Sequence, residues 1–308
     1  MADLFGLVPN FRSQLLAINP WARLHGPAFA AAIDGSRDGA VVALLAARRA
    51  ATLVRLHAGA GLWNHWADQM ARLRLGLDPA ALRLWRLIAE TDLADESFDD
   101  AFDVTHYRFP GPARFAGAAF AGDAWFSRAR FEDTADFRDA VFAGDAVFEG
   151  TRFSAAADFG AARFGRAAEF REIVCGGVAG FVETEFGRDA WFRRSRFEQA
   201  LVFRGARFAA EAGFGDIACT GPADFAEVAF DDNAGFDGAV FDGAVTFSQA
   251  RFGRTAWFNG AAFRGDAEFA RTRFLGRRCF DGIDVALPRH PVAAQIEQLR
   301  RDHLRVAG

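Results

Sequence analysis

The sequence lacks several features that would place it in large and familiar classes. It contains no lysine, one tyrosine and three cysteines among 308 residues. No segment reaches 18 uninterrupted apolar residues, so no transmembrane segment is predicted, and residues 1–14 lack the basic start and apolar run of a signal peptide. Three cysteines without Cys-X-X-Cys spacing suit a reducing compartment. These absences predict a soluble, cytoplasmic protein, and we attribute the absence of lysine to codon bias in a GC-rich bacterium.

Residues that carry out catalysis or bind cofactors are also scarce. No nucleophile has a neighbouring base, no glycine-rich phosphate loop joins a strand to a helix, and no metal-ligand cluster occurs. His57 and His65 have no third ligand at suitable spacing and are interpreted as structural histidines. The net charge of −4 and the hydrophobic content of 51% argue against both a disordered acidic tail and a basic nucleic-acid binder. We therefore expect no catalytic residues, cofactor or metal, and no direct binding of nucleic acid.

The most prominent feature of the sequence is a periodic recurrence of phenylalanine. From Phe109 to Phe280, 32 apolar centres follow one another at alternating steps of five and six residues, and 30 of these centres are Phe. A small residue, usually Ala, stands two positions before each centre, and Gly or polar residues follow it. An α-helix would scatter residues five apart around its axis, and a long flat strand would alternate every two residues. Turns every five or six residues instead predict a solenoid of very short strands.

The unit Ala-X-Phe-X-X, seen as "AVFDG", "ARFGR" and "AAFRG", resembles the pentapeptide-repeat family over about residues 105–284. This resemblance implies a mainly β fold, a right-handed four-sided parallel β-helix in which the small and central residues point inward. Every second unit carries an extra residue, such as Asp123, Asp145, Asp189 or Asn233, so a coil takes 22 residues and the 32 units make eight coils. A flattened two-sided β-roll with eleven residues per coil is the competing geometry.

Two exceptions to the Phe pattern test the inward direction of the centres. Where the centre is Cys175, the residue two before it is Ile173, and where the centre is Cys219, that residue is Ile217. The larger partner compensates for the smaller centre, as expected in a packed interior. The two cysteines lie two coils, or about 10 Å, apart, beyond disulfide reach, and Cys279 faces outward beside a centre.

Both ends of the chain differ from the repeats. Residues 1–100 have helical spacing in 40–59, 61–77 and 78–94, with breaks at Gly59–Gly61 and at Pro79, where Asp78 can cap the next helix. This predicts a small α-helical domain of about four helices, with Trp63, Trp66, Trp85 and Leu84 in its core or against the first coil. The solenoid is expected over 101–285, followed over 286–308 by an amphipathic helix with a stripe of Val292, Ile296, Leu299, His303 and Val306. That helix either caps the last coil or pairs with its copy in a homodimer.

The outward side chains hold any function. The residue before each centre faces out, and sides recur every 22 residues. One column therefore holds Trp125, Trp191 and Trp257, and another holds Asp136, Asp158, Asp224 and Glu268. Exposed Trp commonly marks a contact surface, which favours a non-catalytic protein-interaction or scaffold protein with an unidentified protein partner. A three-coil duplication would explain the same Trp spacing without a function.

The family resemblance implies an alternative function, which is mimicry of DNA toward DNA gyrase or topoisomerase IV, with inhibition or quinolone protection as the result. Such mimicry needs a dense anionic surface, because duplex DNA carries one charge per about 1.7 Å. Residues 109–280 contain 24 Asp and Glu against 21 Arg, and the acidic column fills half of its positions. The near balance of charge makes the scaffold interpretation the stronger of the two.

Overall fold

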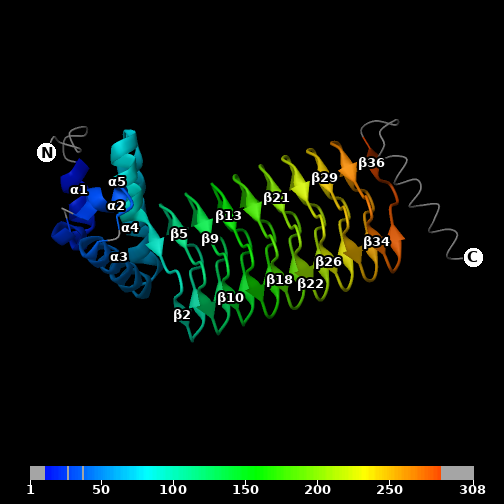
Figure 1. The fold of residues 1–308 in the computed structure, drawn as a ribbon, viewed down its shortest axis with the longest axis horizontal. Coiled ribbons are helices and arrows are strands. Elements are labelled where there is room, and N and C mark those ends of the chain that lie inside the picture. Colours follow the sequence, from blue (N-terminus) through cyan, green and yellow to red (C-terminus); the bar gives the residue numbers. More distant parts are fainter. Residues whose placement is uncertain (1–10, 26–27, 37, 286–308) are drawn as a thin grey trace, which may run out of the picture.

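The computed structural model describes residues 11–25, 28–36 and 38–285, which form a helical domain followed by a long β-solenoid (Figure 1). The helices are α1 (Phe11–Ile18), a 3-10 helix η1 (Pro20–His25), α2 (Ala28–Ile33), α3 (Gly39–His57), α4 (Ala60–Arg74) and α5 (Pro79–Ala89). Asp78 caps α5 as predicted, because its carboxylate accepts hydrogen bonds from the backbone N–H groups of Ala80 and Ala81. Gly59, at φ 86°, separates α3 from α4. None of the described helices is long and apolar enough to cross a membrane.

The solenoid consists of two-residue strands in four parallel sheets, here named sheets A to D, one on each side of the coil. Sheet A contains β1 (Thr91–Asp92), β5 (Ala113–Arg114), β9 (Ala135–Asp136), β13 (Ala157–Asp158), β17 (Ala179–Gly180), β21 (Leu201–Val202), β25 (Ala223–Asp224), β29 (Val245–Thr246) and β33 (Ala267–Glu268). Sheet B contains β2 (Ser97–Phe98), β6 (Ala119–Phe120), β10 (Val141–Phe142), β14 (Arg163–Phe164), β18 (Glu185–Phe186), β22 (Arg207–Phe208), β26 (Ala229–Phe230), β30 (Arg251–Phe252) and β34 (Arg273–Phe274).

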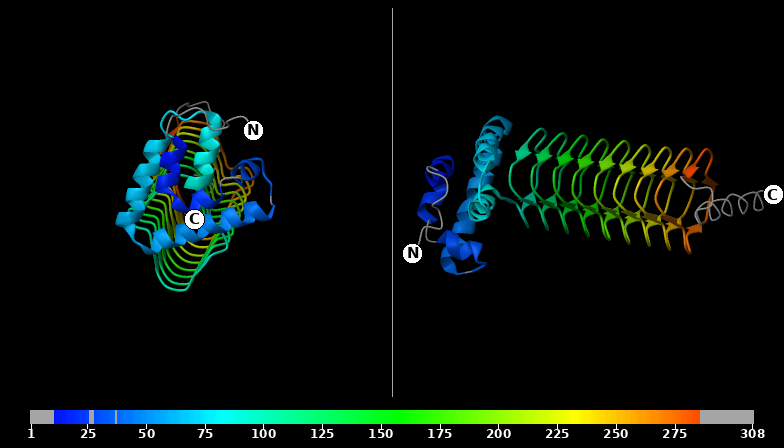
Figure 2. Two further views of the ribbon diagram at one scale, coloured as in Figure 1. Left: turned by 90° about the vertical axis from the view of Figure 1, so that its left-hand side faces the viewer. Right: turned by 90° about the horizontal axis from the view of Figure 1, so that it is seen from above.

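The other two sheets complete the coil. Sheet C contains β3 (Phe102–Asp103), β7 (Ala124–Trp125), β11 (Ala146–Val147), β15 (Ala168–Glu169), β19 (Ala190–Trp191), β23 (Ala212–Gly213), β27 (Ala234–Gly235), β31 (Ala256–Trp257) and β35 (Arg278–Cys279). Sheet D contains β4 (Arg108–Phe109), β8 (Arg130–Phe131), β12 (Arg152–Phe153), β16 (Val174–Cys175), β20 (Arg196–Phe197), β24 (Ala218–Cys219), β28 (Val240–Phe241), β32 (Ala262–Phe263) and β36 (Asp284–Val285). Figure 2 shows the strands of successive coils aligned along the rod.

The strand register confirms the four-sided coil. Each strand pairs with the strand 22 residues away, as Ala135 pairs with Ala157, so the two-sided roll of eleven residues per coil is wrong. The expected number of eight coils is also wrong, because each sheet has nine strands. The additional coil begins at Thr91, within the segment 1–100 that was expected to be helical. Its Phe pattern is incomplete, since Leu93 and Val104 occupy central positions, and both are fully buried.

Two kinds of corner explain the alternation of five and six residues. A residue with positive φ recurs every eleven residues from Asp95 to Gly282 and makes the tight corner. The wider corner contains the extra residue of the six-residue step. On the side that leads into sheet C, the extra side chain links coils: Asp123 accepts a hydrogen bond from the N–H of Asp145 (2.9 Å), and Asn233 accepts one from the N–H of Thr255 (3.1 Å). The additional residue thus satisfies a backbone donor of the next coil.

The core of the rod is a set of stacked rings. Phe137 and Phe159, one coil apart, have centroids 4.7 Å apart and planes inclined by 2°, and edge-to-face contacts join neighbouring sides. Cys175 and Cys219 are fully buried, as are their partners Ile173 and Ile217, so all four point inward as predicted. Burial raises the pKa of the Cys175 thiol to about 11 and that of Cys219 to about 12. All three cysteines are free.

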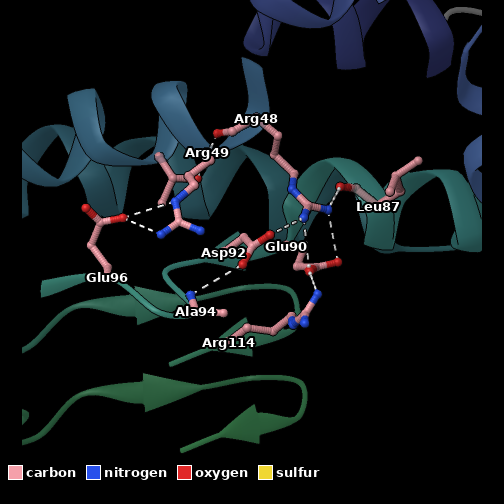
Figure 3. Close-up of polar contacts among 9 residues, drawn as sticks. Arg48, Arg49, Leu87, Glu90, Asp92, Ala94, Glu96 and Arg114 are labelled. Atoms are coloured by element: carbon pink, nitrogen blue, oxygen red, sulfur yellow. Dashed lines mark hydrogen bonds and ion pairs between the residues drawn. The ribbon is translucent and has the colours of Figure 1, made fainter. Parts of the chain in front are cut away.

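The helical domain covers the first coil through a buried ion-pair network (Figure 3). Arg48 of α3 is 2% exposed, and its guanidinium pairs with Glu90 at 3.0 Å and with Asp92 of β1 at 2.8 Å. It also donates a hydrogen bond to the carbonyl of Leu87. Removing one partner from such a buried network leaves uncompensated charge, so the network holds α3 against the rod.

Trp63 adds an apolar contact to this junction. Its ring lies 5.3 Å from that of Phe109, and its Nε1 donates a hydrogen bond to the carbonyl of Arg108 at 2.7 Å. Trp66, Trp85 and Leu84 are buried in the same core, which confirms the predicted role of these four side chains. The domain therefore covers strand edges at this end of the solenoid.

The remaining sequence predictions at the ends have different outcomes. His57 is exposed, and its Nδ1 lies 2.7 Å from the carbonyl of Leu53, whereas His65 lies 3.2 Å from Gln69. The predicted C-terminal stripe falls outside the described residues and stays a prediction, as does a homodimer formed through it. Its members are Val292, Ile296, Leu299, His303 and Val306.

Candidate interaction surface

The three solenoid tryptophans lie on one side of the rod. Trp125, Trp191 and Trp257 occupy the outward positions of β7, β19 and β31 in sheet C, three coils apart. All three are partly exposed. Their common side confirms the column deduced from the sequence, but their surroundings differ. Two outward side chains, Val147 and Glu169, lie between Trp125 and Trp191.

The corresponding positions between Trp191 and Trp257 are glycines. Gly213 pairs with Trp191, and Gly235 pairs with Trp257, so two successive coils carry no outward side chain. A Cβ atom on Gly213 would lie 2.4 Å from Cε3 of Trp191, and one on Gly235 would lie 3.9 Å from Cε3 of Trp257. Trp191 therefore leans toward the following coil and Trp257 toward the preceding coil. The two indoles converge over a glycine floor.

A groove of about 410 Å³ occupies this gap, which we call the Trp191–Trp257 groove. Its lining comprises Trp191, Arg193, Glu211, Ala212, Gly213, Gly215, Gly235, Asp237, Trp257 and Asn259. With about 4.8 Å per coil, the two tryptophans are roughly 14 Å apart along the rod. Stacked Phe214 and Phe236 lie in the interior of the same coils, with centroids 4.8 Å apart. The floor therefore rests on a close-packed core and is preformed.

Two acidic side chains and one basic side chain give the groove its polarity. One carboxylate oxygen of Asp237 accepts the backbone N–H of Asn259 at 3.0 Å, and the other would lie 3.8 Å from a Cβ atom on Gly235. Asp237 thus presents an oxygen near the floor beside Trp257. Arg193 lies over Gly215, with its Nε 3.3 Å from the Cβ position of that glycine. Together with Glu211, these charges make the lining acidic by one unit.

A second hollow of about 310 Å³ adjoins Trp191 on the other side. Arg171, Glu172, Arg193 and Arg194 line it with Trp191, so its charge is basic. The guanidinium of Arg171 lies 6.0 Å from the Trp191 ring centroid and pairs with Glu169 at 2.8 Å. Burial raises the pKa of Glu169, although Arg171 opposes this shift. Trp191 therefore separates an acidic groove from a basic hollow.

The predicted acidic column lies in sheet A, but it is neither continuous nor unpaired. Asp136, Asp158, Asp224 and Glu268 occupy β9, β13, β25 and β33, with Gly180, Val202 and Thr246 between them. Arg138 pairs with Asp136 at 2.7 Å, and Arg204 pairs with Asp224 at 2.6 Å. Partial burial acts to raise the pKa of Asp136, but the hydrogen bonds and charge of Arg138 outweigh it and lower this pKa. Guanidinium groups thus neutralise much of this side.

Sequence reasoning found the tryptophans but missed the groove. The missing signal was the outward residue of the units "EAGFG" (211–215) and "NAGFD" (233–237), which is Gly in both. Reading along the Trp column from position 191 gives Trp, Gly, Gly, Trp. A contact surface was sought in large side chains, whereas this one depends on two positions without any.

The geometry defines the class of the protein, a four-sided parallel β-solenoid with a helical cap and a preformed groove on one side. The family described as pentapeptide repeats (nine copies) matches residues 105–152, 181–229 and 225–273, and the chain belongs to this family. No family match covers the helical domain. No curated protein and no solved structure matches the sequence.

Proposed function

We propose that this protein is a non-catalytic scaffold that binds a partner protein through the Trp191–Trp257 groove. The observation that carries the proposal is the convergence of two partly exposed indoles over Gly213 and Gly235. Partly buried tryptophans beside a preformed hollow are typical of the residues that dominate binding energy at protein interfaces. The rod holds them on a surface without internal hinges, because each coil contacts only its neighbours through a continuous ladder.

Three further observations support an interaction role over catalysis. The groove is lined by carboxylates, a guanidinium and an amide, without a nucleophile next to a base. Among the described residues, no group of three His, Cys, Asp or Glu side chains is arranged to hold a metal ion. The buried Cys175 and Cys219 have raised pKa values, which keeps their thiols protonated and unreactive near neutral pH.

DNA mimicry toward DNA gyrase or topoisomerase IV has less support. It requires a long anionic face, and the acidic column of sheet A is interrupted by Gly180 and Val202. Its carboxylates also pair with arginines, as Arg138 does with Asp136. A surface with alternating charges does not reproduce the charge density of a duplex.

The test is affinity capture of the tagged protein from its native cytoplasm. The variant Trp191→Ala with Trp257→Ala removes both walls of the groove, and Trp125→Ala is the matched control on the same sheet. We expect a specific protein that is retained by the wild type and by Trp125→Ala but lost from the double variant. Circular dichroism verifies that the variants keep their fold. Equal recovery by all three proteins would overturn the proposal, and recovery of gyrase or topoisomerase IV subunits by all three would favour mimicry.

A further inference from the structure

The chemistry of the groove identifies the kind of group that it can hold. Trp191 and Trp257 approach it from opposite ends, so an occupant over Gly213 and Gly235 meets an indole on each side. Indole faces carry negative electrostatic potential and attract cations, most strongly where water is partly excluded. The walls alone therefore favour a cationic or aromatic group over an anion.

The polar side chains discriminate between these two occupants. Asp237 directs one carboxylate oxygen toward the floor beside Trp257, while its other oxygen is held by the N–H of Asn259. Glu211 lies on the same lining, and Arg193 is the single cation there. A neutral aromatic ring would cover two carboxylates without compensating them, which costs free energy. A cation would pair with them and reduce the negative charge of the groove.

We propose that the Trp191–Trp257 groove binds an arginine side chain of the partner protein, an inference that rests on the proposed function. A guanidinium is planar, stacks on aromatic faces and donates hydrogen bonds to carboxylates in its own plane. An ammonium group offers neither the planar stacking nor the bidentate geometry. The protein already places guanidinium groups over its own indoles, with Arg55 4.1 Å from the Trp66 centroid and Arg171 6.0 Å from that of Trp191.

The neighbouring basic hollow sets the direction of the bound segment. Three arginines and one glutamate line it, so it repels the cation that the groove attracts. Arg193 lines both hollows and marks their boundary. The arginine of the partner therefore enters the side nearer Gly235 and Asp237.

The experiment uses the seven indole N–H signals of the full-length protein in ¹H–¹⁵N NMR spectra. Trp191→Phe and Trp257→Phe assign the two groove signals, and the probe is N-acetyl-arginine N-methylamide. Its citrulline counterpart has nearly the same shape without the charge. We expect saturable shifts of the Trp191 and Trp257 signals with the arginine probe, and binding about tenfold weaker for citrulline. The Trp125 signal should not move.

Asp237→Asn is the matched variant, because the amide oxygen of Asn can still accept the N–H of Asn259. We expect it to weaken binding of the arginine probe several-fold while all other indole signals keep their positions. Equal binding of arginine and citrulline, no loss in Asp237→Asn, or no shift at tens of millimolar probe would each overturn the inference. The proposed function fails separately, because partner capture that depends on Trp191 and Trp257 can persist when the arginine probe does not bind.

Discussion

The volume compensation at Cys219 can be tested by a double-mutant cycle. Ile217 and Cys219 are fully buried, and Cys219 pairs in register with Phe197 and Phe241, so it interrupts a stack of rings. Ile217→Ala alone leaves a cavity and should cost about 2–5 kcal/mol of stability. Cys219→Phe alone overfills the same layer and should cost about 1–3 kcal/mol. Together the changes restore the Ala-X-Phe unit of the other coils, and the double variant should lie within about 1 kcal/mol of the wild type.

Local hydrogen exchange is the appropriate assay, because long repeat arrays need not unfold in a single step. The N–H of Val240 donates to the carbonyl of Ile217 at 2.8 Å, and the N–H of Asp242 donates to that of Cys219 at 2.9 Å. Both amides report opening of this layer. We expect each single variant to lower their protection and the double variant to restore it, with a coupling free energy of at least about 3 kcal/mol.

A double variant as unstable as the sum of its two single variants would refute the compensation argument. The same cycle at Ile173 and Cys175 supplies a comparison. The Cys175 thiol lies 3.3 Å from the carbonyl of Gly177, a contact that a phenyl ring cannot make. Rescue should therefore be less complete there than at Cys219.

Two other features give direct predictions. Arg48→Met should destabilise the junction by about 3–5 kcal/mol, because Asp92 and its neighbouring carboxylate lose a buried partner; thermal unfolding and limited proteolysis check this, and unchanged resistance would contradict it. At pH 8, iodoacetamide should label the partly exposed Cys279 but not Cys175 or Cys219, whose raised pKa values keep them protonated. Intact-mass measurement should show one adduct in the folded protein and three after denaturation.

The coil geometry was predictable because every side of the interior repeats the same requirement. A large ring at each centre and a small residue two before it leave one way to close the coil, and the extra residue of each six-residue step announced the 22-residue period. The first coil escaped notice because Leu93 and Val104 replace Phe at its centres. Their burial depends on contact with the helical domain and the next coil, which no local pattern records.

The candidate site was predictable only in part. Trp191 and Trp257 are visible as a column, since sides recur at a fixed interval. The groove depends on how the indoles lean over Gly213 and Gly235, a rotamer choice that follows from the space available in three dimensions. The Arg48 network was likewise hidden, because its partners Glu90 and Asp92 are distant in sequence and ordinary in composition.

The coil repeat makes the solenoid a molecular ruler. The helical domain is fixed to the first coil by Arg48 and Trp63, and Trp191 stands four coils beyond β3, roughly 19 Å along the rod. Insertion or loss of one 22-residue coil between them would move the groove by about 4.8 Å and leave both ends chemically unchanged. The separation of two attached partners can therefore change in whole increments during evolution, without redesign of either contact.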